Sequence, residues 1–236
     1  ASGIAVLFAL IRGFARRSAA TVGNFWIDTY RITAYVLLPL SLVLAVALVS
    51  QGVVQNFSAY KNVNLAEPMI YTAPQLDATG RPMKDTAERV IDRSVTVTSQ
   101  TLPMGPAASQ IAIKQLGTNG GGFFNVNSSH PYENPTPLAD FLETLAILLI
   151  PAALTYTFGK AVGDTRQGWA LLAVMTLIFV GAEVATTHFE QQGNPEFAAL
   201  GVDQTPGTLQ AGGNIEGKES PIGIGAATLW SAATTS

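Results

Sequence analysis

The chain contains 236 residues, of which 48% are hydrophobic and only 12% are charged, and its net charge is −3. It has no cysteine, which excludes a disulfide framework and any metal site built on thiolates. So little charge and such long apolar runs are not typical of a soluble domain. We therefore expect a membrane protein that has the lipid bilayer, and not nucleic acid, as its partner.

Several apolar stretches are long enough to enter a bilayer as helices. Residues 3–11 are interpreted as the end of a span that begins in a longer protein. Complete spans are predicted at residues 32–50, 138–158 and 169–189. At about 1.5 Å per residue, residues 32–49 alone extend about 27 Å, close to the thickness of the hydrocarbon core. Pro39 is expected to kink the first complete span, which membrane helices tolerate.

Two long polar segments separate these spans. Residues 51–101 contain several prolines and an alternating stretch at residues 93–98, a pattern typical of a short strand. We interpret this segment as an outer flap, with an irregular loop as the alternative. Residues 190–221 are acidic and rich in glycine, and are predicted to form a second aqueous loop. Residues 222–236 are too short to span and are interpreted as the start of a half-length helix.

A short helix followed by glycines lies between the first two complete spans. Residues 106–117 are predicted to form a helix, because Pro106 suits the first position of a helix and good helix formers follow it. About ten residues reach only about 15 Å, so this half-helix cannot cross a bilayer. Residues 118–122, Thr-Asn-Gly-Gly-Gly, come next and are called the glycine segment below. The negative end of the helix dipole and a loop of free carbonyls both favour a cation.

Two other interpretations of the glycine segment are weaker. Consecutive glycines after a short helix are often only a flexible loop. A phosphate-binding loop does not fit, because no buried strand precedes the glycines and the chain has no Gly-Lys-Ser or Gly-Lys-Thr sequence. The position between predicted spans favours the cation site.

The basic residues predict how the chain is oriented. Residues 12–31 carry four arginines and one aspartate, and residues 159–168 carry two basic residues and one acidic residue. Short basic turns stay in the cytoplasm, so residues 51–137 and 190–221 are expected to be extracytoplasmic. This alternation requires residues 102–137 to enter and leave the membrane on the same side.

The expected fold is an all-α polytopic membrane protein with repeats of span, re-entrant half-helix, filter and span, as in potassium channels. Short strands are allowed for in its extracytoplasmic loops. In this interpretation residues 1–31 end a first repeat, residues 32–158 form a complete second repeat with its filter at 118–122, and residues 159–236 begin a third.

The segment around the glycines resembles a known family. Residues 118–125, TNGGGFFN, and residues 127–136, NSSHPYENPT, are similar to the potassium-binding subunit of the bacterial Kdp potassium-importing ATPase. Residues 163–168 and 214–219 are similar to the same subunit. The resemblance implies four non-identical repeats around one pore, in the bacterial inner membrane. It also implies a noncatalytic role, with ATP hydrolysis on a separate P-type ATPase subunit, small accessory subunits as further partners, and no cofactor besides the transported K⁺.

On this interpretation, carbonyl oxygens must replace the water shell of K⁺ and still release the ion. We expect the backbone oxygens of Thr118, Asn119 and Gly120 to be the ligands. Gly121 and Gly122 are expected to let the chain turn away from the ion.

Three charged residues are weaker candidates. Glu133 lies beyond the filter and is positioned to draw cations to an outer mouth, but we expect a single solvated carboxylate. For Lys114, snorkelling or a buried ion pair is expected rather than transport chemistry. Glu183 lies well inside a predicted span, where ionisable residues are functional by default, unless it reaches water at the outer end.

Two other functions remain open from the sequence. One is a stand-alone potassium channel or cotransporter of the same superfamily, which would share the filter. The other is a membrane anchor or scaffold in which the glycine segment is incidental. The length of the filter motif and the acidic loop at residues 190–221 favour the ATPase subunit.

Overall fold

The structure is a computed structural model. It describes residues 1–16, 18, 20–77, 79–85, 87, 89–118, 120–124, 128, 130–207, 212–214 and 223–235. Two compact units divide the chain: Asn56–Gly105 form one, and Ala1–Gln55 with Pro106–Ser236 form the other. Each unit is described by itself.

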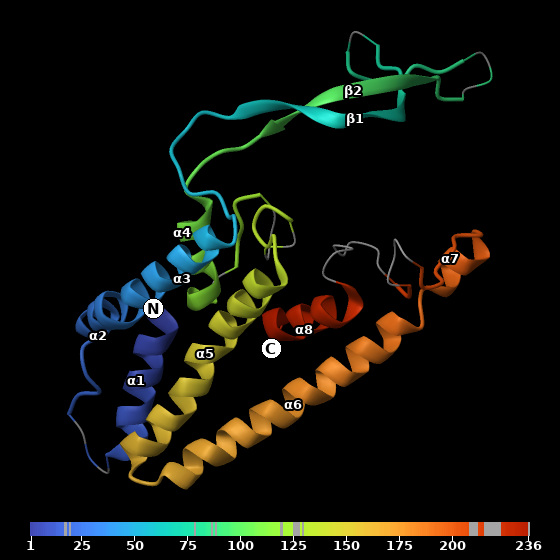
Figure 1. Cartoon of the computed structure of the whole chain (residues 1–236). Helices are drawn as coiled ribbons and strands as arrows, with labels where there is room; N and C mark the ends of the chain where they lie inside the picture. Colours follow the sequence, from blue (N-terminus) through green and yellow to red (C-terminus); the bar gives the residue numbers. More distant parts are fainter. Residues whose placement is uncertain are drawn as a thin grey trace. The chain divides into compact units, whose positions relative to one another are not determined.

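The regular elements of the larger unit are helices among its described residues (Figure 1). Among these residues, three helical stretches are long and apolar enough to cross a membrane: Phe25–Ser50, Pro137–Val162 and Thr165–Ala199. Helix α1 (Ser2–Ala15) is a shorter apolar helix that precedes them. The chain is therefore mostly helical, with the lengths and hydropathy that a membrane protein needs.

The first of these stretches has three parts: α2 (Phe25–Ile32), a π-helical turn at Thr33–Leu37, and α3 (Leu38–Ser50). Pro39 lies in the first turn of α3. In a regular α-helix its ring would clash with the carbonyl one turn earlier, and its missing N–H would leave that carbonyl unpaired. The wider π turn directly before Pro39 accommodates both effects.

This helical stretch begins earlier than the predicted start at residue 32. The side chain of Asn24 accepts hydrogen bonds from the N–H groups of Trp26 and Ile27 and so caps α2. Asp28, which lies in the predicted basic turn, is 7% exposed and forms an ion pair with Arg12 of α1. The charges in this part of the predicted turn are therefore paired between two helices.

Helices α5 (Pro137–Val162) and α6 (Thr165–Gln191) form an antiparallel hairpin, followed by the short helix α7 (Pro195–Ala199). Thr136 caps α5 by accepting the N–H of Ala139 at 3.1 Å. Pro137 occupies the start of α5, where a missing N–H has no cost. Helix α8 (Gly223–Thr235) packs against α5 and α6 (Figure 1).

The short helix α4 (Ala107–Gly117) is the most buried element of the larger unit. It packs against α3 and α5 (Figure 1). Its small residues Ala107, Ala108 and Ala112 are fully buried, and so is Ile111. Pro106 caps the helix from outside, with φ −82° and ψ 55°, and is not the first helical residue as predicted. Small side chains let α4 approach both neighbours closely, which holds its C-terminal end in place.

The smaller unit is a two-stranded antiparallel sheet of β1 (Lys61–Pro74) and β2 (Asp92–Leu102). The alternating stretch predicted at residues 93–98 lies inside β2. The sequence analysis did not predict β1, because Pro68 interrupts its pattern. The register is irregular between Asn64 and Met69, so Pro68 lies where no ladder N–H is required.

The hairpin of α5 and α6 depends on a close backbone contact at Gly168. A Cβ atom there would lie 2.4 Å from the carbonyl oxygen of Thr155 on α5. We expect Gly168→Ala to lower the free energy of unfolding by about 1–3 kcal/mol, because the helices must move apart. Thermal unfolding of the purified chain in detergent measures this.

Gly181→Ala, on the same helix, is the matched control, because a Cβ there would meet no atom within 4 Å. It is expected to be neutral or slightly stabilising, since alanine favours helix. Equal loss of stability in both variants would contradict the close contact.

Candidate functional site

The glycine segment begins directly after α4. Thr118 adopts the left-handed conformation at φ 46° and ψ 38°, and Gly120 and Gly121 have φ of 71° and 96°. Glycine adopts such angles without steric cost, so the glycines match the path of the backbone. Asn119 lies outside the described residues.

The glycine segment borders a cavity of about 280 Å³. Its walls come from one side of α4 and from the glycines. The lining residues are Gln110, Ile111, Ile113, Lys114, Gly120, Gly121, Gly122 and Phe123. The predicted ligand Gly120 therefore lies at an open space beside the end of a short helix.

A buried ion pair lies behind this segment. The Nζ of Lys114, in the last turn of α4, is 2.9 Å from Oε2 of Glu133, and the two side chains are 6% and 0% exposed. The expectation of a solvated Glu133 is therefore wrong, whereas Lys114 forms the buried ion pair that was one of its two expected roles. The two residues lie nineteen positions apart in the sequence, and no local pattern reveals their contact.

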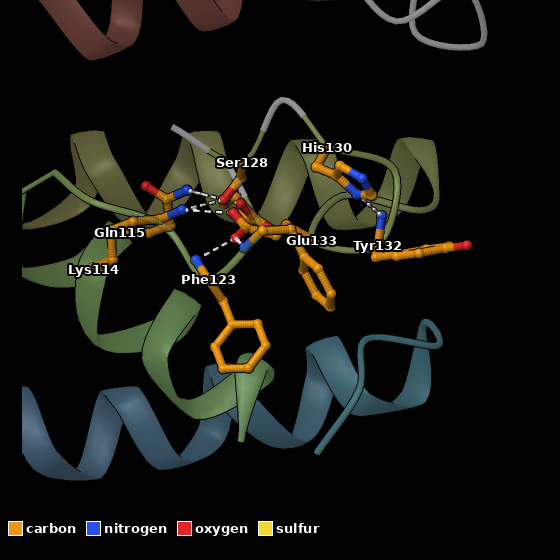
Figure 2. Close-up of polar contacts among 9 residues, drawn as sticks. Lys114, Gln115, Phe123, Ser128, His130, Tyr132 and Glu133 are labelled. Atoms are coloured by element: carbon orange, nitrogen blue, oxygen red, sulfur yellow. Dashed lines mark hydrogen bonds and ion pairs between the residues drawn. The ribbon is translucent and has the colours of Figure 1, made fainter. Parts of the chain in front are cut away.

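The same carboxylate also binds the backbone just after the glycines. Oε1 of Glu133 accepts hydrogen bonds from the N–H groups of Phe123 and Phe124, at 2.5 and 2.6 Å (Figure 2). Burial by itself would raise the pKa of Glu133. The hydrogen bonds from Phe124 and Lys114 outweigh this effect and hold the pKa below its ordinary value of 4.5.

Three further polar side chains surround the pair. Ser128 Oγ accepts hydrogen bonds from Lys114 Nζ and from Gln115 Nε2, at 2.5 and 3.0 Å (Figure 2). Gln115 also donates to Oε2 of Glu143, on α5, at 2.8 Å. Oε1 of Glu143 has no hydrogen-bond partner among the described residues. No role was predicted for Gln115, Ser128 or Glu143; for Gln115 and Glu143 the available signal was a polar residue in an apolar helix.

The described residues around Glu133 also contact one another and the start of α5. The rings of Phe124, His130 and Tyr132 lie within 5.4 Å of one another, centroid to centroid, and those of Phe124 and His130 are stacked. Asn134 donates to Oδ1 of Asp140, in the first turn of α5, at 2.7 Å. These contacts position the residues on both sides of Glu133.

Glu183, the third charged candidate, belongs to a different contact. Its Oε1 accepts hydrogen bonds from Thr187 on α6 and from Thr228 on α8, at 3.0 and 3.1 Å. Thr228 is fully buried. Glu183 therefore links α6 to α8, and it makes no hydrogen bond with those residues of the glycine segment that the structure describes.

The fold and the site define a helical membrane protein in which a short buried helix leads into a glycine turn supported by a buried ion pair. Comparison with known protein families shows which family this chain belongs to. The chain belongs to the family of the potassium-transporting ATPase A subunit, KdpA, whose model matches residues 1–236.

Three proteins of similar sequence support the assignment to this family. The chain is 60% identical over 238 residues to a protein of Paracidovorax citrulli, 59% over 235 to one of Methylococcus capsulatus, and 57% over 235 to one of a Janthinobacterium species. Each is named potassium-transporting ATPase potassium-binding subunit, a name distinct from that of a catalytic subunit. All of this chain is covered, but it spans only 38–40% of the length of these relatives.

The lowered pKa of Glu133 predicts how stability depends on pH. A carboxylate whose pKa is lower in the folded state stabilises the fold above its unfolded pKa, and the contribution is lost as the pH falls through the folded value. We expect the chain to lose stability below pH 4.5. Glu133→Gln should be less stable at neutral pH, because Lys114 stays buried without its partner, and should lose less on acidification.

Thermal unfolding in detergent, followed from neutral pH to about pH 3, compares the two proteins. An equal loss of stability on acidification in both would contradict the role of Glu133.

Proposed function

We propose that this chain supplies a K⁺-selecting segment of the potassium-binding, noncatalytic subunit of an ATP-driven potassium importer. The observation that carries the proposal is the glycine turn. Gly120 and Gly121 adopt positive φ directly after a short buried helix and border a cavity. The names of relatives that are about 60% identical support the same function.

In the proposed mechanism, K⁺ is bound by backbone oxygens. The carbonyls of Thr118, Asn119 and Gly120 replace part of the water shell of the ion, and Gly121 and Gly122 turn the chain away. Carbonyl dipoles suit this task because they bind a monovalent ion strongly enough to dehydrate it and weakly enough to release it. The C-terminal end of α4, with its partial negative charge, favours the same ion.

The proposal includes an orientation in the bacterial inner membrane. Residues 51–137 and 190–221 are extracytoplasmic, so K⁺ reaches the glycine segment from outside. Residues 12–31 and 159–168 are on the cytoplasmic side, and the first of these segments includes the end of α1 and nearly all of α2. Residues 32–158 act as one complete span-filter-span repeat, between the end of a first repeat and the start of a third. A separate P-type ATPase subunit hydrolyses ATP, and small accessory subunits complete the assembly.

Replacing Gly120 tests the proposal. Gly120 has φ 71°, where a side chain strains the backbone, although a Cβ there would meet no atom within 4 Å. In the assembled importer with the full-length subunit, Gly120→Ser should displace a carbonyl ligand while the fold persists. Disturbing a hydrogen-bond partner of a charged group costs about 1.5–3 kcal/mol, so apparent K⁺ affinity should fall about 10- to 100-fold. Titrating the potassium-stimulated ATPase activity with K⁺ measures this apparent affinity.

Gly207→Ser is the matched control, because Gly207 has an ordinary φ and nothing lies within 4 Å of its Cβ position. It should leave the half-saturating K⁺ concentration unchanged. If Gly120→Ser behaves in the same way and keeps its discrimination against Na⁺ and Rb⁺, residues 118–122 are not the filter.

The isolated chain is expected to be inactive as a pore. One glycine segment supplies only part of a carbonyl ring, and a half-dehydrated ion in a membrane is prohibitively costly. Reconstituting residues 1–236 alone in liposomes should give no potassium-selective flux. A selective flux would contradict the proposal that several repeats share one filter.

A further inference from the structure

We propose that Lys114 and Glu133 are positioning residues for the glycine segment. Their ion pair holds the backbone on both sides of residues 118–122 and thereby sets affinity and selectivity for K⁺. This inference rests on the proposed function, because it concerns the same segment.

The two oxygens of the Glu133 carboxylate bind different parts of the chain. Oε2 of Glu133 binds Lys114 in the last turn of α4, shortly before the glycine segment begins. Oε1 binds the N–H groups of Phe123 and Phe124, directly after the segment ends. The chain that enters the segment and the chain that leaves it are therefore tied to the same side chain (Figure 2).

The glycine segment needs such support from outside. Gly120 and Gly121 have no side chains, and Cβ atoms at their positions would meet nothing within 4 Å in the part of the chain that the structure describes. Glycine adopts positive and negative φ about equally readily, so these residues do not select one conformation. Discrimination between ions depends on the number and placement of the carbonyls. The placement must therefore come from the flanking contacts.

Stability alone does not explain the ion pair. Lys114 is 6% and Glu133 0% exposed, and burying two charges costs desolvation that their attraction must offset. Apolar residues of similar volume often serve as well in such places. Lys114 lies on a helix whose residues Ile111 and Leu116 are buried and apolar. What an apolar pair cannot provide is a charged acceptor for two backbone N–H groups.

The pair also has an electrostatic consequence. Lys114 lines the same cavity as the glycines. Without Glu133, its positive charge would repel K⁺ from a site of low dielectric constant. Without Lys114, the carboxylate would keep its two N–H donors and its negative charge. Loss of Glu133 should therefore weaken K⁺ binding more than loss of Lys114.

The test uses the assembled importer containing the full-length subunit. ATPase activity is titrated with K⁺, Rb⁺ and Na⁺ for Glu133→Gln, Lys114→Met and the double variant. Glu133→Gln should raise the half-saturating K⁺ concentration about 10-fold or more, and Lys114→Met should raise it less. The double variant removes both charges of the pair, so neither Lys114 nor Glu133 leaves a buried charge without its partner. It should recover part of the affinity but still discriminate less well between K⁺ and Rb⁺.

A second ion pair among the described residues provides a matched control. Arg12 and Asp28 connect α1 to α2, and neither makes a hydrogen bond with the described residues of the glycine segment. The double variant Arg12→Met with Asp28→Asn should keep the ratio of K⁺ to Rb⁺ affinity. The same change in both double variants would indicate general loosening of the fold and would overturn the proposal.

The double variant of Lys114 and Glu133 decides the remaining outcomes. If it assembles with unchanged affinity and ion preference, the proposal is overturned. If it does not assemble, the pair is required for folding, and a specific positioning role is also overturned. If Gly120→Ser changes ion preference and the double variant does not, only this inference fails. If neither changes it, the proposed function fails as well.

Discussion

The buried carboxylate of Glu133 is the constraint on which the site depends. A charge that is fully removed from water is tolerated only where its oxygens are satisfied, and here Lys114 and two backbone N–H groups do this. The need to satisfy this carboxylate constrains the position of α4 as well as that of the loop. Lys114 reaches Glu133 only if α4 lies deep between α3 and α5, and the fully buried alanines on α4 let it do so. The position of the glycine turn follows from a charge that must be paired.

Polar contacts also decide which helices meet elsewhere in the chain. In lipid the hydrophobic effect does not choose between one apolar helix face and another, so small residues and hydrogen bonds make the choice. Helices α1 and α2 are joined by Arg12 and Asp28, and α4 and α5 by Gln115 and Glu143. Helices α5 and α6 meet where Gly168 removes a side chain. Each contact depends on one or two residues in an otherwise apolar surface.

This explains how much the sequence could predict. Hydropathy and length are properties of a local window, so the predicted span at residues 138–158 lies within α5, and the predicted half-helix at 106–117 differs from α4 by one residue. The prediction was wrong where a charged residue is paired by another element. Residues 12–31 were interpreted as a basic turn, although Asp28 lies in α2 and is paired with Arg12, and Glu133 was expected to be a solvated carboxylate. Their partners lie sixteen and nineteen positions away, beyond any local pattern.

The glycine segment also shows which features a local sequence pattern can predict and which it cannot. Three consecutive glycines reveal that the backbone must be free to take unusual angles, and the structure places Gly120 and Gly121 at positive φ. The glycines do not reveal what restricts that freedom, because the restricting atoms belong to Lys114, Ser128 and Glu133. In the proposed filter of backbone oxygens, side chains of the segment itself carry little of the specificity. The proposal assigns that specificity to neighbouring polar residues, which single-sequence patterns do not connect to the segment.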